Sequence, residues 1–267
     1  MTLFDLAGFL LTGVLTGLLA GLFGVGGGVI VVPALILLFG HLGFGGDWIP
    51  HLAVGSSLAA IVGTGAASAL AHHRRGSVRW DLVLALAPGI VLGAGAGAWA
   101  AGALPKVWLT RVFATFLAFV GLRMLLPPRR HVPRPLPGPL GMAAVGGGIG
   151  ALSALVGIGG GTLTVPFLNG RGLGMRLAVG SSAACGLPIA LTGALGFILV
   201  GWGREGLPPG STGFVYWPAV AAILLASVPS APLGAHLAHA LPVRHLRRAF
   251  GVLLLGMAFY LAGWGAG

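Results

Sequence analysis

Acidic residues, cysteine and charge in general are scarce in this chain of 267 residues. Asp and Glu together number 4, cysteine occurs once, at Cys185, and charged residues make up 7% of the sequence. A soluble domain has about 25% charged residues, so this chain has too few to cover a water-facing surface. A single cysteine excludes an intrachain disulfide. Because Cys185 lies in an apolar run, we interpret it as a small packing residue.

Apolar residues take the place of the missing charges. They make up 57% of the sequence, mean hydropathy is +1.00, and long apolar runs recur along the whole chain. We therefore predict an all-α polytopic membrane protein in a cell (inner) membrane, with the lipid bilayer as solvent. The formal net charge is +11. The basic residues stand in short breaks between apolar runs, which indicates membrane topology rather than nucleic-acid binding. The first run, Leu3 to Leu22, lacks a basic region and a cleavage site, so we predict a retained membrane helix.

Glycine, proline and arginine divide the chain into ten apolar segments. Most have about 20 residues, enough to cross a hydrocarbon core of about 30 Å. Two segments, Val29–Phe39 and Thr162–Leu168, are shorter and contain Pro33 and Pro166. The breaks between segments are Gly24–Gly28, His41–Pro50, Arg74–Arg79, Ala103–Lys106, Pro127–Pro139, Gly157–Gly161, Asn169–Arg176, Gly201–Gly213 and Leu241–His245.

An internal repeat is visible in the sequence. GLFGVGGG (Gly21–Gly28) matches ALVGIGGG (Ala154–Gly161), and a Val-Pro pair follows each. AVGSS occurs at Ala53–Ser57 and again at Ala178–Ser182. A third motif, which begins with Leu-Pro, recurs after these two in the same order. This pattern predicts a duplication, with a first transmembrane repeat, a cytoplasmic linker and a second transmembrane repeat at residues 1–126, 127–139 and 140–267.

The arginines predict that the two halves run in opposite directions. Arg74–Arg79 marks one loop as cytoplasmic, and the arginine-rich linker at 127–139, two helices later, is again cytoplasmic. Arg171 and Arg176 mark the loop before the second AVGSS as cytoplasmic, whereas the equivalent loop of the first half, His41–Pro50, has no Lys or Arg. We therefore predict two inverted five-helix repeats, each starting with a Gly-rich broken helix or hairpin, an arrangement typical of secondary transporters.

A glycine triplet opens each short segment and predicts an anion site. Glycine permits a sharp reversal and leaves the first amides of the next helix uncovered. Those amides and the positive end of the helix dipole attract an anion without a charged side chain. The alternative is that the glycines allow close helix crossing. The residues concerned are Gly26, Gly27 and Gly28 in the first half and Gly159, Gly160 and Gly161 in the second.

Hydroxyl side chains follow the triplets and complete the predicted substrate-binding site. A hydroxyl near a helix start either caps the helix or donates to a bound oxyanion. Inverted copies bring both serine pairs toward one axis. We predict no catalytic residue, no metal ligand and no cofactor. The hydroxyl residues are Ser56 and Ser57, their counterparts Ser181 and Ser182, and Thr162.

Titratable residues argue against a cation substrate. The four acids lie near helix ends or in loops, whereas proton and cation pumps keep carboxylates inside the membrane. We interpret His236 and His239, near a helix end, as interfacial residues rather than proton relays. Arg111 and Arg248 hold equivalent positions one turn into their helices. They either extend to the lipid headgroups or form an electropositive vestibule that concentrates anions.

Enzyme motifs such as GxxxxGK, HExxH and CxxC are missing. The nearest arrangement is Ser56 or Ser181 as an intramembrane nucleophile paired with His236. A duplicated serine motif fits poorly with a single nucleophile, so we predict no enzymatic activity.

The chain resembles the TauE/SafE family, also called the toluene sulfonate uptake permease family. The resemblance lies in GLFGVGGGVIVVPAL and AVGSS, with their second copies ALVGIGGGTLTVPFL and AVGSS, and covers essentially the whole chain. It implies transport of small sulfur-containing anions such as sulfite, sulfoacetate or other short sulfonates at the glycine triplets and serine pairs. Distantly related thiosulfate importers use several cysteines. Such chemistry is not expected here, because Cys185 is alone and its repeat counterpart is Ala60.

Residues and resemblance together predict a secondary transporter, an exporter of these anions, that works by alternating access. An inside-negative potential favours anion exit by about 2.3 kcal/mol per charge per 100 mV, so export needs no coupling ion. A passive anion channel and a non-transporting membrane assembly factor are the alternatives. The expected partners are the anion and the lipid bilayer, with no nucleic acid, and a homodimer is left open as the assembly.

Overall fold

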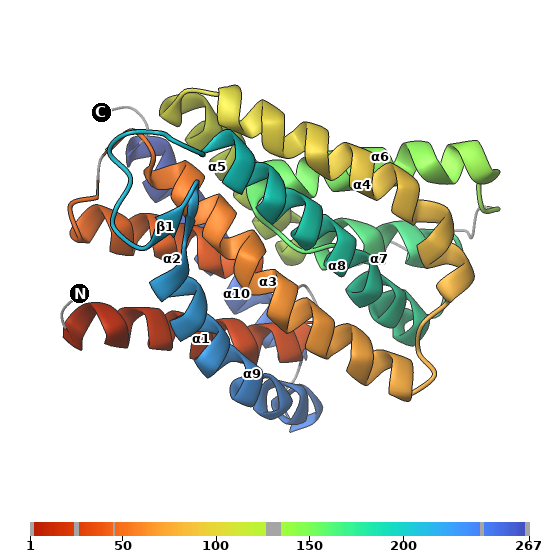
Figure 1. The fold of residues 1–267 in the computed structure, drawn as a ribbon. Coiled ribbons are helices and arrows are strands. Elements are labelled where there is room, and N and C mark those ends of the chain that lie inside the picture. Colours follow the sequence, from red (N-terminus) through yellow and green to blue (C-terminus); the bar gives the residue numbers. More distant parts are fainter. Residues whose placement is uncertain (1–2, 24–26, 45, 127–134, 241–242, 265–267) are drawn as a thin grey trace.

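Ten α helices make up most of the chain that the structure describes, as Figure 1 shows. The computed structural model describes residues 3–23, 27–44, 46–126, 135–240 and 243–264. The prediction of ten helical segments is confirmed. The helices are α1 (Leu3–Phe23), α2 (Gly28–His41), α3 (Ile49–Arg74), α4 (Trp80–Ala103), α5 (Lys106–Leu125), α6 (Pro139–Val156), α7 (Gly161–Gly170), α8 (Met175–Val200), α9 (Trp217–Ala240) and α10 (Val243–Trp264).

A small hairpin precedes α9 and was not predicted. Strands β1 (Ser211–Thr212) and β2 (Val215–Tyr216) pair antiparallel within the break between α8 and α9. Gly213 lies between them with φ +54°, a conformation that suits glycine. The hairpin places Tyr216 at the start of α9, where its ring packs on Phe9, Phe39 and Phe44.

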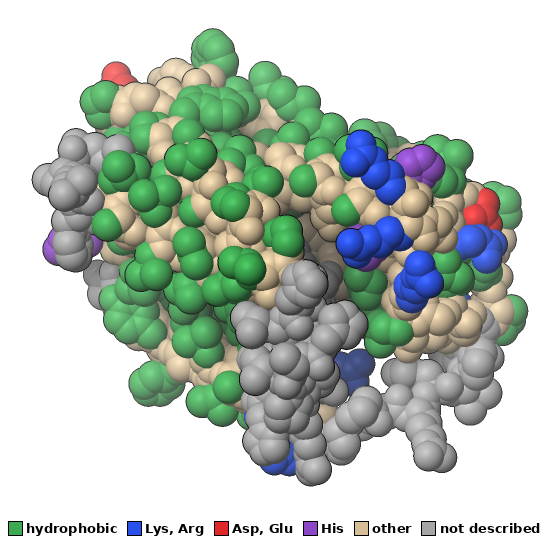
Figure 2. Space-filling view, turned by 90° about the horizontal axis from the view of Figure 1, so that it is seen from below, with side chains coloured by type: hydrophobic (Ala, Val, Ile, Leu, Met, Phe, Trp, Pro, Cys, Tyr) green, Lys and Arg blue, Asp and Glu red, His purple; other side chains and the backbone are tan. Residues whose placement is uncertain are grey.

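The outer surface is largely apolar. Leu92, Leu140 and Phe259 are 76%, 86% and 85% exposed. Figure 2 shows apolar side chains spread over the face, with Lys and Arg gathered toward one end. Five helices of the described chain are long and apolar enough to cross a membrane, namely α3, α4, α5, α6 and α8. An apolar exterior of this extent agrees with hydrocarbon, not water, as the solvent for most of the surface.

Helix pairing is reciprocal between the two halves. The long helices α3 and α8, of 26 residues each, pack against one another. Around them α2 packs on α3 as α7 packs on α8, and α4 packs on α6 as α9 packs on α1. Helices α5 and α10 pair with each other. The counterparts of α1 to α5 are α6 to α10, in that order. Replacing each helix by its counterpart reproduces this set of contacts.

Glycines spaced four residues apart bring α4 and α6 close together. A Cβ added at Gly93 would meet the carbonyl oxygen of Gly147, and one at Gly150 would lie near the Ile90 carbonyl. The matching pair α1 and α9 shares this device, because a Cβ at Gly13 would lie 2.7 Å from the Ile223 carbonyl oxygen. Small residues at such spacing allow helix backbones to approach, which explains why these two pairs form.

Gly93→Ala is expected to lower the stability of the protein by about 1–3 kcal/mol, because the new methyl has only the α6 backbone to displace. Gly95→Ala on the same helix is the matched control. Its Cβ would meet nothing nearer than the Thr192 Cγ2 atom at 3.7 Å, and alanine favours the helix. Thermal unfolding of the two purified variants measures the difference. Equal melting temperatures would contradict glycine-mediated packing of α4 on α6.

Candidate substrate-binding site

The turns that carry the two glycine motifs meet in the interior of the protein. A Cβ added at Gly28 would lie 2.5 Å from the carbonyl oxygen of Gly157 and 2.8 Å from the Cα of Ile158. Gly157 ends α6 with φ +71°, and a Cβ there would lie 3.0 Å from the Cα of Val54 on α3. Glycine is required at this junction both for the backbone conformation and for space. Two motifs 133 residues apart in sequence, as counted from Gly24 to Gly157, are thus brought into contact.

Each turn presents the start of a short helix. In α7 the first i→i−4 bond runs from the Thr164 amide to the Gly160 carbonyl at 2.8 Å, so the amides of residues 161–163 precede it. In α2 the amides of Ile30 and Val31 both donate to Gly27 at 3.0 and 3.1 Å. The predicted site residues Gly27, Gly28, Gly159, Gly160 and Gly161 are all buried, Thr162 is half-buried, and Gly26 lies outside the described residues.

The first serine of each AVGSS motif supports the segment that leads into a neighbouring helix. Ser56 on α3 accepts a hydrogen bond from the Tyr216 amide, at 2.9 Å, just before α9. Ser181 on α8 accepts one from the Arg79 amide, also at 2.9 Å, just before α4. Both hydroxyls are fully buried. The two copies therefore share one structural role, and in each the hydroxyl hydrogen can still be donated.

The preceding glycine of the motif takes part in the same contact. A Cβ at Gly55 would meet the Phe214 carbonyl oxygen, and one at Gly180 would meet the Ser77 carbonyl oxygen. Without a side chain, the α3 and α8 backbones can approach these incoming segments. In each half the Gly-Ser pair of the motif therefore packs against, and bonds to, the segment just before a neighbouring helix. That helix is α9 for Gly55–Ser56 and α4 for Gly180–Ser181.

The second serine of each motif lies close to a glycine-rich segment. Ser57 donates to the Gly157 carbonyl at 2.8 Å, which ties α3 to the α6–α7 turn. Ser182 is 1% exposed, and its hydroxyl has no hydrogen-bond partner among the described residues. Ser182 lies beside Gly160, since a Cβ there would be 3.1 Å from the Ser182 carbonyl oxygen. A buried hydroxyl without a partner costs free energy, so the missing partner of Ser182 calls for an explanation.

Thr16, which was not among the predicted site residues, is a further polar residue near the glycine turns. It lies on α1, is 4% exposed, and its hydroxyl has no partner among the described residues. A Cβ at Gly27 would clash with the Thr16 methyl group, so the two residues touch. A single threonine in an apolar helix carries no signal in one sequence. Only the fold places it beside the start of α2.

One end of the protein brings together two basic loops and the described end of the linker. Arg176 donates to Ser77 Oγ and to the Arg75 carbonyl, both at 3.1 Å, and Arg171 donates to the Pro135 carbonyl at 2.6 Å. The loops 74–79 and 171–176 and the end of the linker therefore lie together. The linker arginines between 127 and 134 lie outside the described residues.

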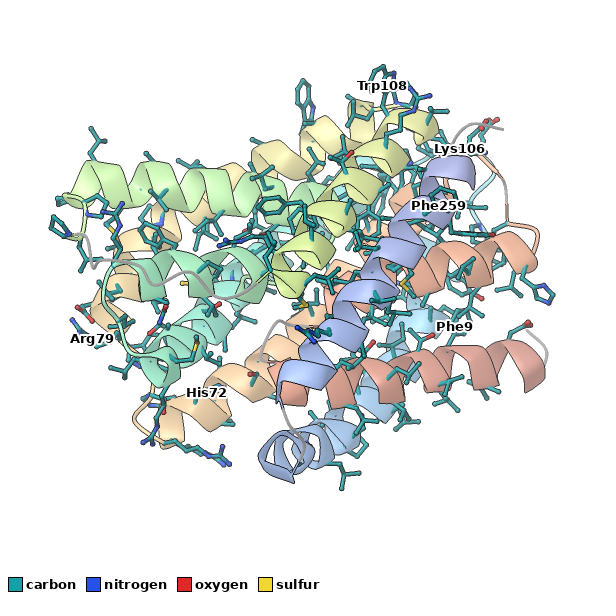
Figure 3. The ribbon with its side chains drawn as sticks, turned by 180° about the vertical axis from the view of Figure 1, so that it is seen from behind. Phe9, His72, Arg79, Lys106, Trp108 and Phe259 are labelled. Atoms are coloured by element: carbon teal, nitrogen blue, oxygen red, sulfur yellow. The ribbon has the colours of Figure 1, made fainter. Side chains whose placement is uncertain are left out.

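The opposite end carries the loops that are poor in arginine. Arg204 stacks over the Trp48 ring at 5.3 Å, which joins the 41–50 loop to the break before α9. His51 Nε2 lies 3.2 Å from the Ala101 carbonyl and 3.1 Å from the Leu104 carbonyl at the α4–α5 turn. Figure 3 places Arg79 and Lys106 at opposite ends of the molecule.

The remaining candidates lie away from the glycine turns or outside the description. Arg111 is exposed and stacks over the Trp108 ring at 5.5 Å, and Arg248 is exposed on α10. Cys185 is fully buried in an apolar cluster that includes Leu168 and Ile189. The side chains of His236 and His239 lie outside the described part. Among the described residues no group of His, Cys, Asp and Glu could hold a metal ion.

Comparison with known proteins decides the family. A family model described as "Sulfite exporter TauE/SafE" matches residues 9–261. The chain belongs to the TauE/SafE family. Its relatives include a "Probable membrane transporter protein" of Haemophilus influenzae, 38% identical over 250 residues that cover 93% of this chain and 95% of the relative. A protein of the same description from Xylella fastidiosa is 28% identical over 258 residues, covering 94% of this chain and 92% of the relative.

Membership of the TauE/SafE family makes the chain a multi-pass membrane transporter rather than an enzyme. A further relative, "Probable membrane transporter protein YdhB" of Bacillus subtilis, is 26% identical over 259 residues, or 90% of this chain and 96% of the relative. No solved structure matches the chain significantly. The predictions of the family and of a membrane transporter are therefore confirmed.

Proposed function

We propose that this transporter exports small sulfur-containing oxyanions such as sulfite, sulfoacetate or other short sulfonates. The observation that carries the proposal is the meeting of the two glycine turns, Gly28 against Gly157 and Ile158, beside serines of α3 and α8. The family description names sulfite export, which supports a sulfur oxyanion as substrate.

The chemistry of the junction favours an anion. The first amides of α2 and α7 point out of the helix starts, and the helix dipoles add positive potential there. The Ser182 hydroxyl supplies a side-chain donor. A sulfite or sulfonate group has three oxygens that accept such hydrogen bonds. Because the acids Asp47, Asp81 and Glu205 are exposed, no carboxylate from these positions opposes the negative charge.

Inverted repeats provide the movement in this proposal. The reciprocal helix contacts and the separation of the 41–50 loop from the equivalent 171–176 loop support two halves of opposite orientation. The α1–α2 and α6–α7 hairpins then reach the junction from opposite faces, as in other transporters with inverted repeats. Rocking of one part against the other would expose the junction to each side in turn.

Gly46 and Gly174 should be accessible from opposite sides of the membrane if the repeats are inverted. Both are exposed, and a side chain at either would meet nothing within 4 Å, so cysteine fits there. In a Cys185→Ala background, a membrane-impermeant thiol reagent added to intact cells should label Gly46→Cys and leave Gly174→Cys unlabelled until the cells are opened. Labelling of both from outside would end the inverted-repeat proposal.

A passive anion channel is the second candidate, and the burial of the junction argues against it. Gly28, Ser57, Gly157 and Gly160 are all buried, so among the described residues no open path passes the point where Gly28 meets Gly157. A channel would conduct anions without a conformational cycle. Saturable flux with counterflow of labelled substrate would support a carrier, whereas electrogenic flux that does not saturate would support a channel. A non-transporting assembly factor would bind no anion.

A binding screen tests the proposal directly. Purified protein is heated with sulfite, sulfoacetate, taurine, thiosulfate or sulfate, and stabilisation by one of them identifies a ligand. Ser182→Ala should weaken the binding of that ligand by about 1.5–3 kcal/mol, because a hydrogen bond to a charged group is lost. Ser230→Ala is the control, since Ser230 is a buried serine of α9 whose hydrogen bonds to described residues stay within its own helix. Failure of every sulfur anion to stabilise the protein or to be transported in vesicles would refute the proposal.

A further inference from the structure

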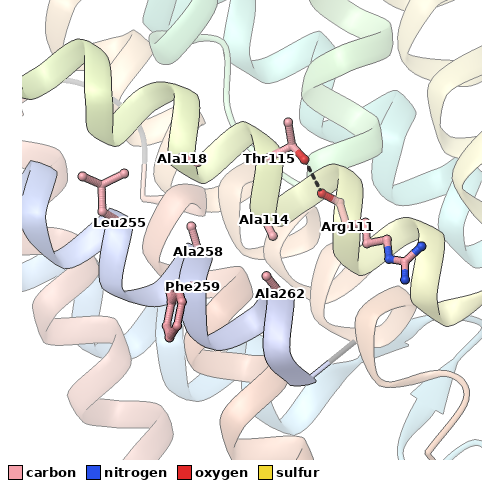
Figure 4. Close-up of a pocket in the computed structure, with 8 residues that line it drawn as sticks. All are labelled: Arg111, Ala114, Thr115, Ala118, Leu255, Ala258, Phe259 and Ala262. Carbon is pink, nitrogen blue, oxygen red and sulfur yellow. Dashed lines mark hydrogen bonds between the residues drawn. The ribbon is translucent and has the colours of Figure 1, made fainter. Parts of the chain in front are cut away.

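Helices α5 and α10 cross closely and then leave a groove. At the crossing, a Cβ on Gly121 would lie 2.9 Å from the Gly251 carbonyl oxygen, and one on Gly251 would lie 3.0 Å from that of Gly121. Beyond the crossing, the helices border an open groove of about 450 Å³. Figure 4 shows the groove with alanines from both helices facing each other across it.

The floor of this α5–α10 groove is small and apolar. Ala114 and Ala118 of α5 face Ala258 and Ala262 of α10, and Leu255 closes the end near the crossing. Phe259, which is 85% exposed, forms a wall. The groove opens on the apolar exterior of the protein, so hydrocarbon surrounds it in a membrane.

One cation stands at the other end of the groove. Arg111 lines it, is exposed, and stacks over Trp108 at 5.5 Å near the start of α5. Trp and Arg near a helix end belong at the level of the lipid headgroups. Ala118 is seven residues further along α5, so the groove extends roughly 10 Å from that level into the bilayer. Thr115 at the rim donates its hydroxyl to the Arg111 carbonyl at 2.8 Å, so this hydroxyl is already bonded within α5. The Arg111 guanidinium is then the charged group of the groove that a ligand can meet.

We propose that this groove binds a phospholipid, with its phosphate on Arg111 and one acyl chain along the alanine floor. Charge complementarity selects a phosphate for the cationic end, and a hydrocarbon chain is the partner that an apolar groove within the bilayer accepts. A helix of a second copy fits less well, because a volume of this size holds only about one turn of a helix that is about 10 Å wide. Basic sites between membrane helices bind anionic headgroups by the same chemistry.

Native mass spectrometry of the full chain with added phosphatidylglycerol tests the site. The wild-type protein should retain one lipid under conditions that strip the others. Arg111→Gln should lower retention about fivefold, the value of one cation near a membrane surface. Arg123→Gln, at an exposed arginine near the other end of α5 and outside the groove, should retain lipid as wild type does.

Ala118→Phe tests the apolar half of the site by filling the groove. It should lower lipid retention while Arg111 remains, and Leu92→Phe, on the exposed face of α4, controls for added aromatic surface. Melting temperatures are measured together with lipid retention. If Ala118→Phe fails to fold, the lipid retention of Arg111→Gln alone tests the site. Unchanged retention in Arg111→Gln would overturn the proposal. So would a change from dimer to monomer in Ala118→Phe with lipid retention intact, because a second copy would then occupy the groove.

Discussion

Gly160→Val is expected to abolish anion transport. A single Cβ at this position would already lie 3.1 Å from the Ser182 carbonyl oxygen and 3.2 Å from the Gly186 amide nitrogen. The two further carbons of valine would occupy the space before the first amides of α7, where we place the anion. They would also press α7 away from α8, so some stability is lost with the activity. Transport into vesicles and the melting temperature are measured on the same purified protein.

Gly186→Ala separates loss of the site from loss of packing. The added methyl would lie 3.4 Å from the Gly160 amide nitrogen, an ordinary contact, and it meets nothing closer. Alanine also favours the helix by about 1 kcal/mol over glycine, so the variant should be at least as stable as wild type. If the anion binds the Gly160 amide, the methyl shields that donor and affinity should fall about tenfold or more, the value of one hydrogen bond to a charged group.

Gly65→Ala is the matched control for Gly186→Ala. It lies on α3, the counterpart of α8, and its Cβ would have only the Ile61 Cγ2 atom of its own helix nearby, at 3.7 Å. It should keep wild-type affinity. Normal affinity in a stable Gly186→Ala protein, together with a lowered melting temperature in Gly160→Val, would identify the glycines as packing residues and remove them from the site.

The helices could be predicted from sequence because their ends are marked locally. Glycine, proline and arginine stand where apolar runs stop, and the short segments predicted at Val29–Phe39 and Thr162–Leu168 are close to α2 and α7 as observed. The repeat was visible because both copies keep the same residues at the same spacing. The hairpin before α9 was not predicted, since two strands of two residues each are too short to produce a periodic pattern.

The partners of the serines could not be predicted from sequence. The repeat indicated that the two AVGSS motifs share a role in anion binding, and that role stays a prediction. What the structure shows is a matching structural contact: Ser56 accepts a hydrogen bond from Tyr216 across 160 residues and Ser181 from Arg79 across 102. Such pairs depend on how helices pack, which no local pattern specifies. The place of the anion among the glycines and serines therefore remains a prediction.

Efflux of substrate should rise with membrane potential when no pH gradient is present. Each negative charge moved across 100 mV is worth about 2.3 kcal/mol, an equilibrium concentration ratio of roughly 50 for a monovalent anion. Vesicles loaded with labelled substrate and clamped inside-negative with potassium and valinomycin provide the measurement. The same vesicles at zero potential, and with a protonophore added, are the controls. Uniport predicts a potential-driven rate that the protonophore leaves unchanged.

Strict dependence on a proton gradient would contradict uniport and require a proton carrier inside the protein. Two buried titratable residues, neither of them predicted as a proton carrier, are candidates. Asp5 is 5% exposed at the start of α1, and His51 is fully buried in α3 with its Nδ1 atom lacking a partner among the described residues. Asp5→Asn keeps the shape of the side chain, and His51→Gln keeps an amide donor for the carbonyls that Nε2 meets; both changes remove the titratable group. If either variant freed transport from the proton gradient, that residue would be the carrier. If neither did, His236 would be the next residue to test, because it is a further titratable group in an apolar helix.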